Sequence, residues 1–156
     1  MPEPKPFSHL DSTGRARMVD VSGKPPIARE AIAEAFFCAA SATLDRLLDD
    51  ALPKADALAT ARIAGIQAAK RTSELIPLCH PLPLTHVEVH FERTDDNRLR
   101  IQATTRTIDR TGVEMEALTA CSIAALTLWD MTKAVDNGLR VTEVTLVSKT
   151  KKELTP

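Results

Sequence analysis

Apolar and polar residues alternate along two neighbouring stretches, Thr85–Glu92 and Arg98–Thr105. This alternation is typical of strands that bury one face. The polar sequence TDDN joins the two stretches, and a short polar link between such runs predicts a β-hairpin. Further strands are predicted at Met18–Ser22 and at Val141–Val147.

Two longer stretches carry apolar residues at the spacing of a helix. Asp56–Glu74 is rich in alanine and has Gly65 at its centre, and small residues there indicate close helix packing or a subunit interface. Val113–Val135 is the second long helix. Asn137 and Gly138 follow it and predict its end.

The segment Arg29–Ala40 fits two secondary structures. Its alanine and glutamate content favours a helix, while its alternation, with alanines at every second position, fits a strand. Ser41 then resembles the N-cap of a short helix. The order of elements predicts an α+β fold with helices on one face of an antiparallel sheet.

Composition narrows the range of functions. The chain has 156 residues, enough for one domain, and a formal net charge of -1, so no global field attracts nucleic acid. Aromatic residues make up 3%, which leaves few stacking platforms for single strands. No apolar run reaches the length of a membrane span, about 20 residues. Three separated cysteines and a polar N-terminus indicate a reduced, cytoplasmic protein without disulfides or a signal peptide.

The sequence KRTSELIPLCHP, from Lys70 to Pro81, concentrates reactive side chains. Its prolines fix the backbone and predict a stiff loop at a helix end. A histidine presented there, His80, beside Lys70 and Arg71 suggests handling of an anionic substrate. A purely structural loop histidine is the alternative.

The second long helix carries acidic groups at its start and an acid–lysine pair near its end. Glu114 and Glu116 flank Met115 in the first turn, where both carboxylates reach the same helix mouth. Asp130 and Lys133 are three residues apart and share a helix face. These groups suggest a groove with acid–base chemistry. The alternative is that the glutamates complement the helix dipole and that the later pair is solvated.

A metal site is a further alternative. His86, Glu88 and His90 share one face of a predicted strand, which is more often a solvated face. Cys79 and His80 lack a second pair of ligands at zinc spacing. A zinc hydrolase or deaminase that uses these residues is therefore one competing hypothesis. The chain has no phosphate-binding loop of the NTPase or Rossmann type.

Three blocks resemble a known family. They are MVDVSGKP (Met18–Pro25), ATARIAGIQAAKRTSELIPLCHPLPL (Ala59–Leu84) and TGVEMEALTACSIAALTLWDMTKAV (Thr111–Val135). Together they resemble the cyclic pyranopterin monophosphate synthase family of molybdenum cofactor biosynthesis, over roughly residues 8 to 150. The resemblance implies a ferredoxin-like α+β fold in which Arg29–Ala40 is a strand.

The resemblance also implies an activity and an assembly. The family is a lyase that converts a cyclised dihydroguanosine triphosphate, made from GTP, into cyclic pyranopterin monophosphate and releases pyrophosphate. It uses no redox cofactor, and Mg²⁺ is a possible helper for the leaving group. The family assembles as a homohexamer, a trimer of dimers with active sites at the dimer interfaces. The expected division is a flexible arm at 1–17, a single catalytic domain at 18–150 and a tail at 151–156.

The resemblance assigns roles residue by residue. The residues expected to be catalytic are Lys54, His80, Asp130 and Lys133. Lys133 or Lys54 is expected to act as general acid or base, with Asp130 orienting Lys133. His80 is expected to assist proton transfer or to hold the ribose–phosphate part. The carboxylates expected to bind the guanine-derived edge are Glu114 and Glu116, with Met115 and Cys79 beside them, Cys79 as a packing residue. The cations expected at the phosphates are Lys24, Arg29 and Lys70.

The end of the chain departs from the family pattern. The family commonly follows a lysine in its last strand with a Gly-Gly pair, and this chain has Lys151 and Lys152 there. Backbone amides that could approach a phosphate are lost, while cations are gained. Lys149 is the one residue of this tail that the resemblance carries over. A non-catalytic ferredoxin-like nucleotide-binding protein is the competing hypothesis from another class.

Overall fold

The computed structural model describes residues 8–52 and 56–154. The elements in chain order are β1 (Ile27–Cys38), α1 (Ser41–Leu48), α2 (Ala57–Lys70), α3 (Thr72–Leu75), β2 (Leu84–Asp95), β3 (Arg98–Asp109), α4 (Glu114–Thr132) and β4 (Arg140–Lys152). The predicted hairpin and both long helical stretches are therefore present.

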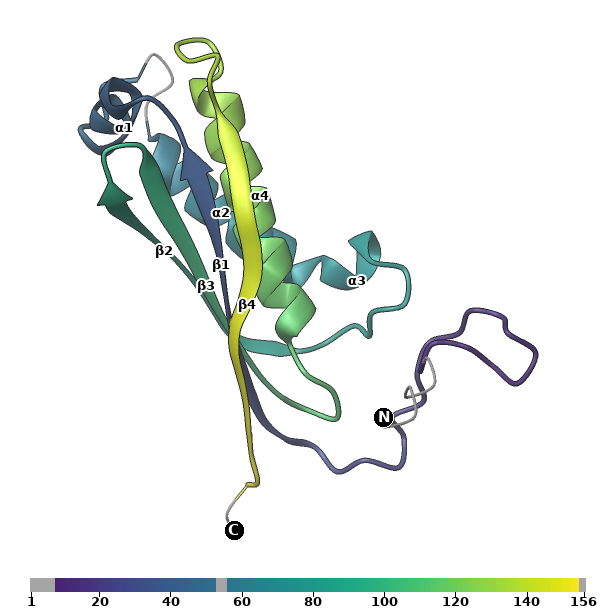
Figure 1. The fold of residues 1–156 in the computed structure, drawn as a ribbon. Coiled ribbons are helices and arrows are strands. Elements are labelled where there is room, and N and C mark those ends of the chain that lie inside the picture. The colour runs from purple at the N-terminus through teal and green to yellow at the C-terminus, as the bar shows by residue number, and fades with distance from the viewer. Residues whose placement is uncertain (1–7, 53–55, 155–156) are drawn as a thin grey trace, which may run out of the picture.

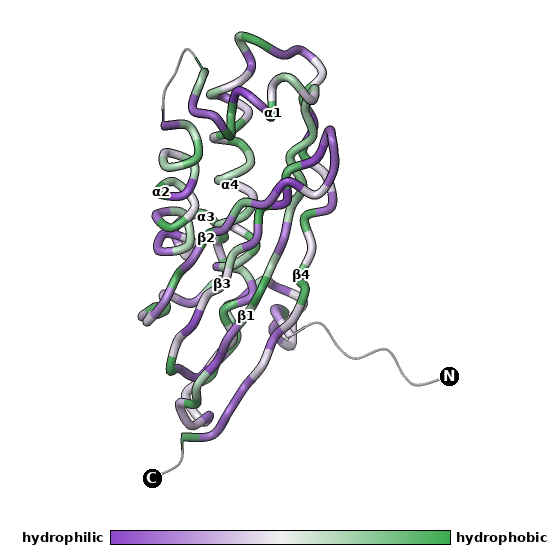
Figure 2. Tube along the Cα trace, turned by 90° about the vertical axis from the view of Figure 1, so that its left-hand side faces the viewer, coloured by the Kyte–Doolittle hydropathy of each residue, from purple (hydrophilic) through white to green (hydrophobic). Residues whose placement is uncertain are grey.

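The strands form one four-stranded sheet in the order β2-β3-β1-β4, and every neighbouring pair is antiparallel. Helices α2 and α4 cover one face of this sheet (Figure 1). Figure 2 shows the same two layers from the side. Since the chain runs as two split β-α-β units, the predicted α+β, ferredoxin-like fold is confirmed.

The ambiguous segment is the strand β1. It pairs with β3 on one edge and β4 on the other, so tertiary hydrogen bonding overrides its helix propensity. The side chains of Ala31, Ala33, Ala35 and Phe37 are at most 1% exposed. The alternation noted in the sequence therefore marks the face that packs against the helices.

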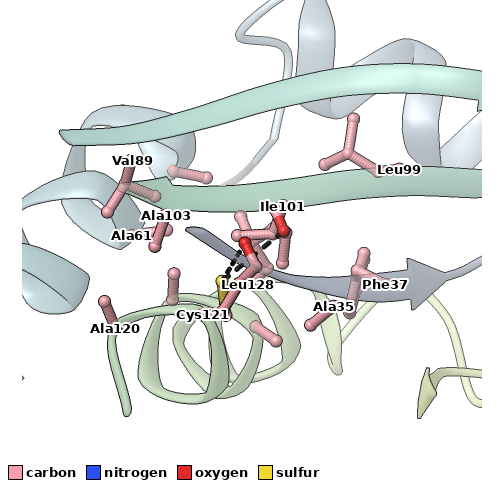
Figure 3. Close-up of a cluster of buried hydrophobic side chains, with 14 of the residues drawn as sticks. Ala35, Phe37, Ala61, Val89, Leu99, Ile101, Ala103, Ala120, Cys121 and Leu128 are labelled. Carbon is pink, nitrogen blue, oxygen red and sulfur yellow. Dashed lines mark hydrogen bonds between the residues drawn. The ribbon is translucent and has the colours of Figure 1, made fainter. Parts of the chain in front are cut away.

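Small side chains let α4 approach both α2 and the sheet. A Cβ at Gly65 of α2 would lie 2.9 Å from the backbone oxygen of Ala120 and 3.3 Å from Cβ of Ala124. On the neighbouring face of α4, the Cys121 thiol donates to the carbonyl of Ala33, with 3.3 Å between Sγ and O. Figure 3 shows Cys121 pointing from the helix toward the sheet. Gly65 therefore marks close helix packing, which is one of the two alternatives that the sequence left open.

The predicted strand at Met18–Ser22 is wrong. These residues adopt no strand conformation, because no other strand lies beside them to complete a ladder. The prediction of Ser41 as N-cap is also wrong. Ala40 is the N-cap residue, and the carboxylate of Asp136, far along the chain, accepts hydrogen bonds from the Ala40 amide and the Thr43 hydroxyl at 2.8 and 2.9 Å.

Both ends of the described part of the chain carry structure that the sequence pattern did not predict. The last strand extends beyond Val147 to Lys152, because the start of β1 offers it backbone partners, and Arg29 lies opposite Lys151. Of the expected N-terminal arm, the described part includes a small turn closed by a bridge between Leu10 and Ala16. Residues 1–7 and 155–156 lie outside the described residues.

None of the described helices combines the length and the apolar character that crossing a bilayer requires.

We expect Gly65→Ala to destabilise the fold. The added methyl group improves helix propensity by about 1 kcal/mol but meets backbone oxygen and overpacks the contact, which costs about 1–3 kcal/mol. A lower thermal unfolding midpoint is the expected result. Gly23→Ala is the matched control, because no heavy atom lies within 4 Å of its added Cβ. An unchanged midpoint for Gly65→Ala would show that the helices can separate without penalty.

Candidate active site

A cavity of about 370 Å³ opens at the start of α4. Three segments line it: the loop that follows α3, the first turn of α4 with its preceding loop, and the N-terminal segment. Cys79 and His80 come from the first of these, Glu114, Met115 and Glu116 from the second, and Lys24 from the third. The structure thus brings together six of the residues that the sequence predicted.

Glu116 is the buried acid of this cavity. Its side chain is only 4% exposed. Burial, together with the nearby charge of Glu114, raises the pKa of Glu116 to about 7 from its ordinary 4.5. Near neutral pH this carboxyl group therefore exists in both protonation states, as a general acid or base requires.

Glu114 stays ionised. Its carboxylate folds back over Gly112, where an added Cβ would lie 1.9 Å from Oε2, and it accepts a hydrogen bond from Lys149 with 2.9 Å between Nζ and Oε1. Burial alone would raise its pKa, but the hydrogen bonds from Lys149 and its own amide, and the charges of Lys149 and Arg29, hold the pKa of Glu114 below its ordinary value. The two carboxylates therefore differ in charge.

His80 is oriented by the N-terminal segment. Its Nε2 lies 2.7 Å from the carbonyl oxygen of Val19. A carbonyl only accepts, so Nε2 carries the hydrogen of this contact. Residues 18–22 thus serve as an extended strap, not as a strand.

The neighbouring Cys79 does not present a thiolate. Burial, followed by the negative charge of Glu116, raises the pKa of the Cys79 thiol. A thiol that keeps its proton is a poor nucleophile and a poor metal ligand.

The loop before α4 makes hydrogen bonds to β1 and to Lys24, which follows the strap. Arg29 of β1 donates from Nε to the Asp109 carbonyl at 3.0 Å and from Nη2 to the Arg110 carbonyl at 2.9 Å. Arg110 in turn donates from Nε to the Lys24 carbonyl at 3.0 Å. Arg29 therefore has a structural task that the sequence did not indicate, besides the phosphate contact expected of it.

A second cavity of about 290 Å³ adjoins the first, since Gly112 and Glu114 line both. Its remaining lining is mostly basic and comes from β1 and β4, with Arg29, Lys149 and Lys151 among it. Lys151 was missed as a site residue, because in the sequence it is only a departure from the family pattern. The two cavities together combine carboxylate acceptors and cations.

Other predicted residues lie elsewhere. Asp130 and Lys133 form an ion pair with 2.7 Å between Oδ1 and Nζ, and both side chains are more than half exposed. They sit at the opposite end of α4, about 24 Å (Asp130) and about 28 Å (Lys133) along the helix from Glu114. Lys70 lines a separate open cavity with His86 and Leu84. Lys54 lies outside the described residues.

The histidine strand does not form the metal site that its spacing suggested. His86 Nε2 and Glu88 Oε2 are 3.7 Å apart on the exposed face of the sheet. Within residues 8–52 and 56–154, no group of three or more His, Cys, Asp or Glu side chains is arranged to hold a metal ion.

Comparison with known proteins points to one family. A profile described as the MoaC family matches residues 18–152. A cyclic pyranopterin monophosphate synthase of Chloroflexus aggregans (strain MD-66 / DSM 9485) is 56% identical over 146 residues, which cover 92% of this chain and 87% of that protein. One of Desulfatibacillum aliphaticivorans is 54% identical over 144 residues, with 92% and 91% covered. The family match spans the strap, the histidine loop and α4.

We expect Glu116→Gln to change how stability depends on pH. The folded protein holds a proton on Glu116 up to about pH 7, while the unfolded chain releases it near 4.5. Wild-type stability therefore falls as the pH rises through this interval. Relative to wild type, the variant should gain on the order of 3 kcal/mol in free energy of unfolding between about pH 4.5 and about pH 8.

Denaturant unfolding at several pH values measures this gain. Glu114→Gln is the control of opposite sign, because the lowered pKa of Glu114 contributes stability above its unfolded pKa that is lost as the pH falls. Profiles of the Glu116 variant and wild type that run parallel would contradict the assignment of a raised pKa.

Proposed function

The chain belongs to the MoaC family, and on this premise we propose that it is a cyclic pyranopterin monophosphate synthase, a lyase of molybdenum cofactor biosynthesis. Its substrate is the cyclised dihydroguanosine triphosphate, and its products are cyclic pyranopterin monophosphate and pyrophosphate. The observation that carries the proposal is the near full-length match to two synthases at 56% and 54% identity.

The two adjoining cavities support this substrate. A guanine-derived ring presents N–H donors, which suit carboxylate acceptors such as Glu114 and Glu116. Phosphates suit the basic wall that includes Lys149. His80, fixed by the Val19 carbonyl, stands in the first cavity as a group for proton transfer.

We propose that Lys133 acts as a general acid or base and that Asp130 orients it. Their ion pair of 2.7 Å supports the orienting role. A lysine exchanges protons near neutral pH only when its pKa falls through burial or neighbouring cations. Since Lys133 is largely exposed in the single chain, the proposal requires another surface to cover it. Lys54 is proposed to act with it.

A second copy of the chain is the proposed source of that surface. Lys133 cannot reach the carboxylates of its own α4, about 28 Å away, so a complete site needs α4 ends from two chains. Large apolar side chains are exposed on α4 and β4, among them Leu126 at 55%, Trp129 at 36% and Val147 at 51%, and such a surface suits an interface. Following the family resemblance, we propose that this interface belongs to a homohexamer built as three dimers.

We further propose which cofactors the reaction uses and where in the cell it takes place. The reaction proceeds without a redox cofactor, and Mg²⁺, if it participates, is bound chiefly by the substrate's phosphates, because expulsion of pyrophosphate concentrates negative charge there. The proposed location is the cytoplasm, as for a biosynthetic enzyme whose three cysteines are free.

Lys133→Ala should lower kcat by about 10²-fold or more, since one positioned acid or base contributes that much. Pyrophosphate release from the purified cyclic nucleotide measures turnover. Lys152→Ala, a change at another exposed lysine, should keep wild-type turnover. Normal turnover by the Lys133 variant would remove it from the mechanism, whereas wild-type binding without any turnover would favour the non-catalytic alternative.

Mixed assemblies test the shared site. Lys133→Ala and Glu114→Ala chains, each inactive alone, should regain about one quarter of wild-type activity when unfolded and refolded together at equal amounts. Random pairing makes half of the dimers mixed, and each mixed dimer rebuilds one of its two sites. Each variant refolded alone is the control. Mixtures that stay inactive while mass spectrometry shows mixed dimers would contradict a site that combines Lys133 of one chain with Glu114 of the other.

A further inference from the structure

The last strand directs two of its lysines toward the active site. In the register of β4 with β1, Lys149 lies opposite Ala31 and Lys151 opposite Arg29. Ala31 belongs to the strand face that packs against the helices. Because side chains two residues apart share a face, Lys149 and Lys151 stand on the side of the sheet where α4 begins.

The charged side chains that line the second cavity differ in whether they have an oppositely charged partner. Lys149 is neutralised by Glu114 at 2.9 Å, and the carboxylate of Glu30 is occupied by Arg106 at 2.5 Å. No ion pair or hydrogen bond joins Lys151 to another side chain among residues 8–52 and 56–154.

Arg29 adds a second positive charge to the second cavity. Its guanidinium donates to two backbone carbonyls, which bind it without cancelling its charge. The second cavity therefore carries the charge of Arg29, which also acts on Glu114, and that of Lys151, which pairs with no carboxylate among the described residues. An anion that enters there would find both available.

We propose that Lys151 is a phosphate-binding residue, which holds the diphosphate end of the substrate against Arg29 in the second cavity. The identity of the ligand rests on the proposed function, while the site itself rests on the cavity and its charges. The family resemblance assigns no role to this position, where glycine is common. In this chain the side-chain cation of Lys151 would take the place of the backbone amides that glycines leave free to approach a phosphate.

Lys151 faces the site, whereas Lys152 does not. Lys152 lies opposite Ala28 and lines a groove with Arg106 and Ile108, on the face of the sheet that no helix covers. The two lysines are adjacent, equally charged and both exposed. Lys152→Gln is therefore a matched control that removes the same charge from the opposite face.

Calorimetric titration with inorganic pyrophosphate at low ionic strength tests the site. We expect Lys151→Gln to raise the Kd about tenfold, as for a charge-assisted hydrogen bond in a partly exposed site. Lys152→Gln should change it less than about twofold, and Lys151→Arg should restore binding. The effect of Lys151→Gln should shrink as salt is added, because exposed charges are screened. Equal losses in the two glutamine variants, or no loss in either, would overturn the proposal.

Turnover of the cyclic nucleotide separates this proposal from the proposed function. If Lys151 binds the phosphates, Lys151→Gln should raise KM while the Lys152 variant keeps the wild-type value. If the wild-type enzyme turns over normally and the Lys151 variant keeps the same KM and the same pyrophosphate Kd, only the role of Lys151 is ruled out. A wild-type protein without turnover would sink the proposed function, and the pyrophosphate titration would still decide whether the site binds phosphate.

Discussion

The close approach of α4 to α2 and to β1 is the constraint on which the rest of the structure depends. It requires small side chains on all three elements, because the backbone oxygen of Ala120 leaves room for no more than a hydrogen at Gly65. On a neighbouring face of α4, the Cys121 thiol donates to the strand carbonyl of Ala33. Interiors packed this tightly do not deform gradually, so the start of α4 is held in one position against the sheet.

That fixed position creates two electrostatic environments around one residue. Glu114 lines both cavities. On one side lies the buried carboxyl of Glu116, and on the other the basic wall formed by Arg29, Lys149 and Lys151. A ligand with hydrogen-bond donors at one end and phosphates at the other complements this arrangement. The segment at 18–22 completes the first cavity, because its carbonyl at Val19 fixes the ring of His80.

The length of α4 keeps Asp130 and Lys133 away from these two cavities. A straight helix of 19 residues separates the acids at its start from Asp130 and Lys133 at its end, so no motion within one chain that preserves this packing can unite them. Exposed apolar side chains on α4 and β4 suit a protein–protein interface. The proposed division of the site between chains rests on this separation along α4.

The sequence alone determined the elements whose pattern is local. The alternating hairpin, both long helices, the position of Gly65 and the carboxylates of the first turn of α4 all follow from spacing. It did not decide the conformation of Arg29–Ala40, because alanine and glutamate suit a helix while the alternation suits a strand. The predicted strand at Met18–Ser22 was wrong, because a strand needs a neighbouring strand to pair with. The predicted cap at Ser41 was wrong, because Asp136, distant in the chain, accepts the hydrogen bond at the start of α1. Only the tertiary structure showed that Lys151 joins the basic wall while Lys70 stands apart, since charges separated in sequence meet only when strands and helices are packed.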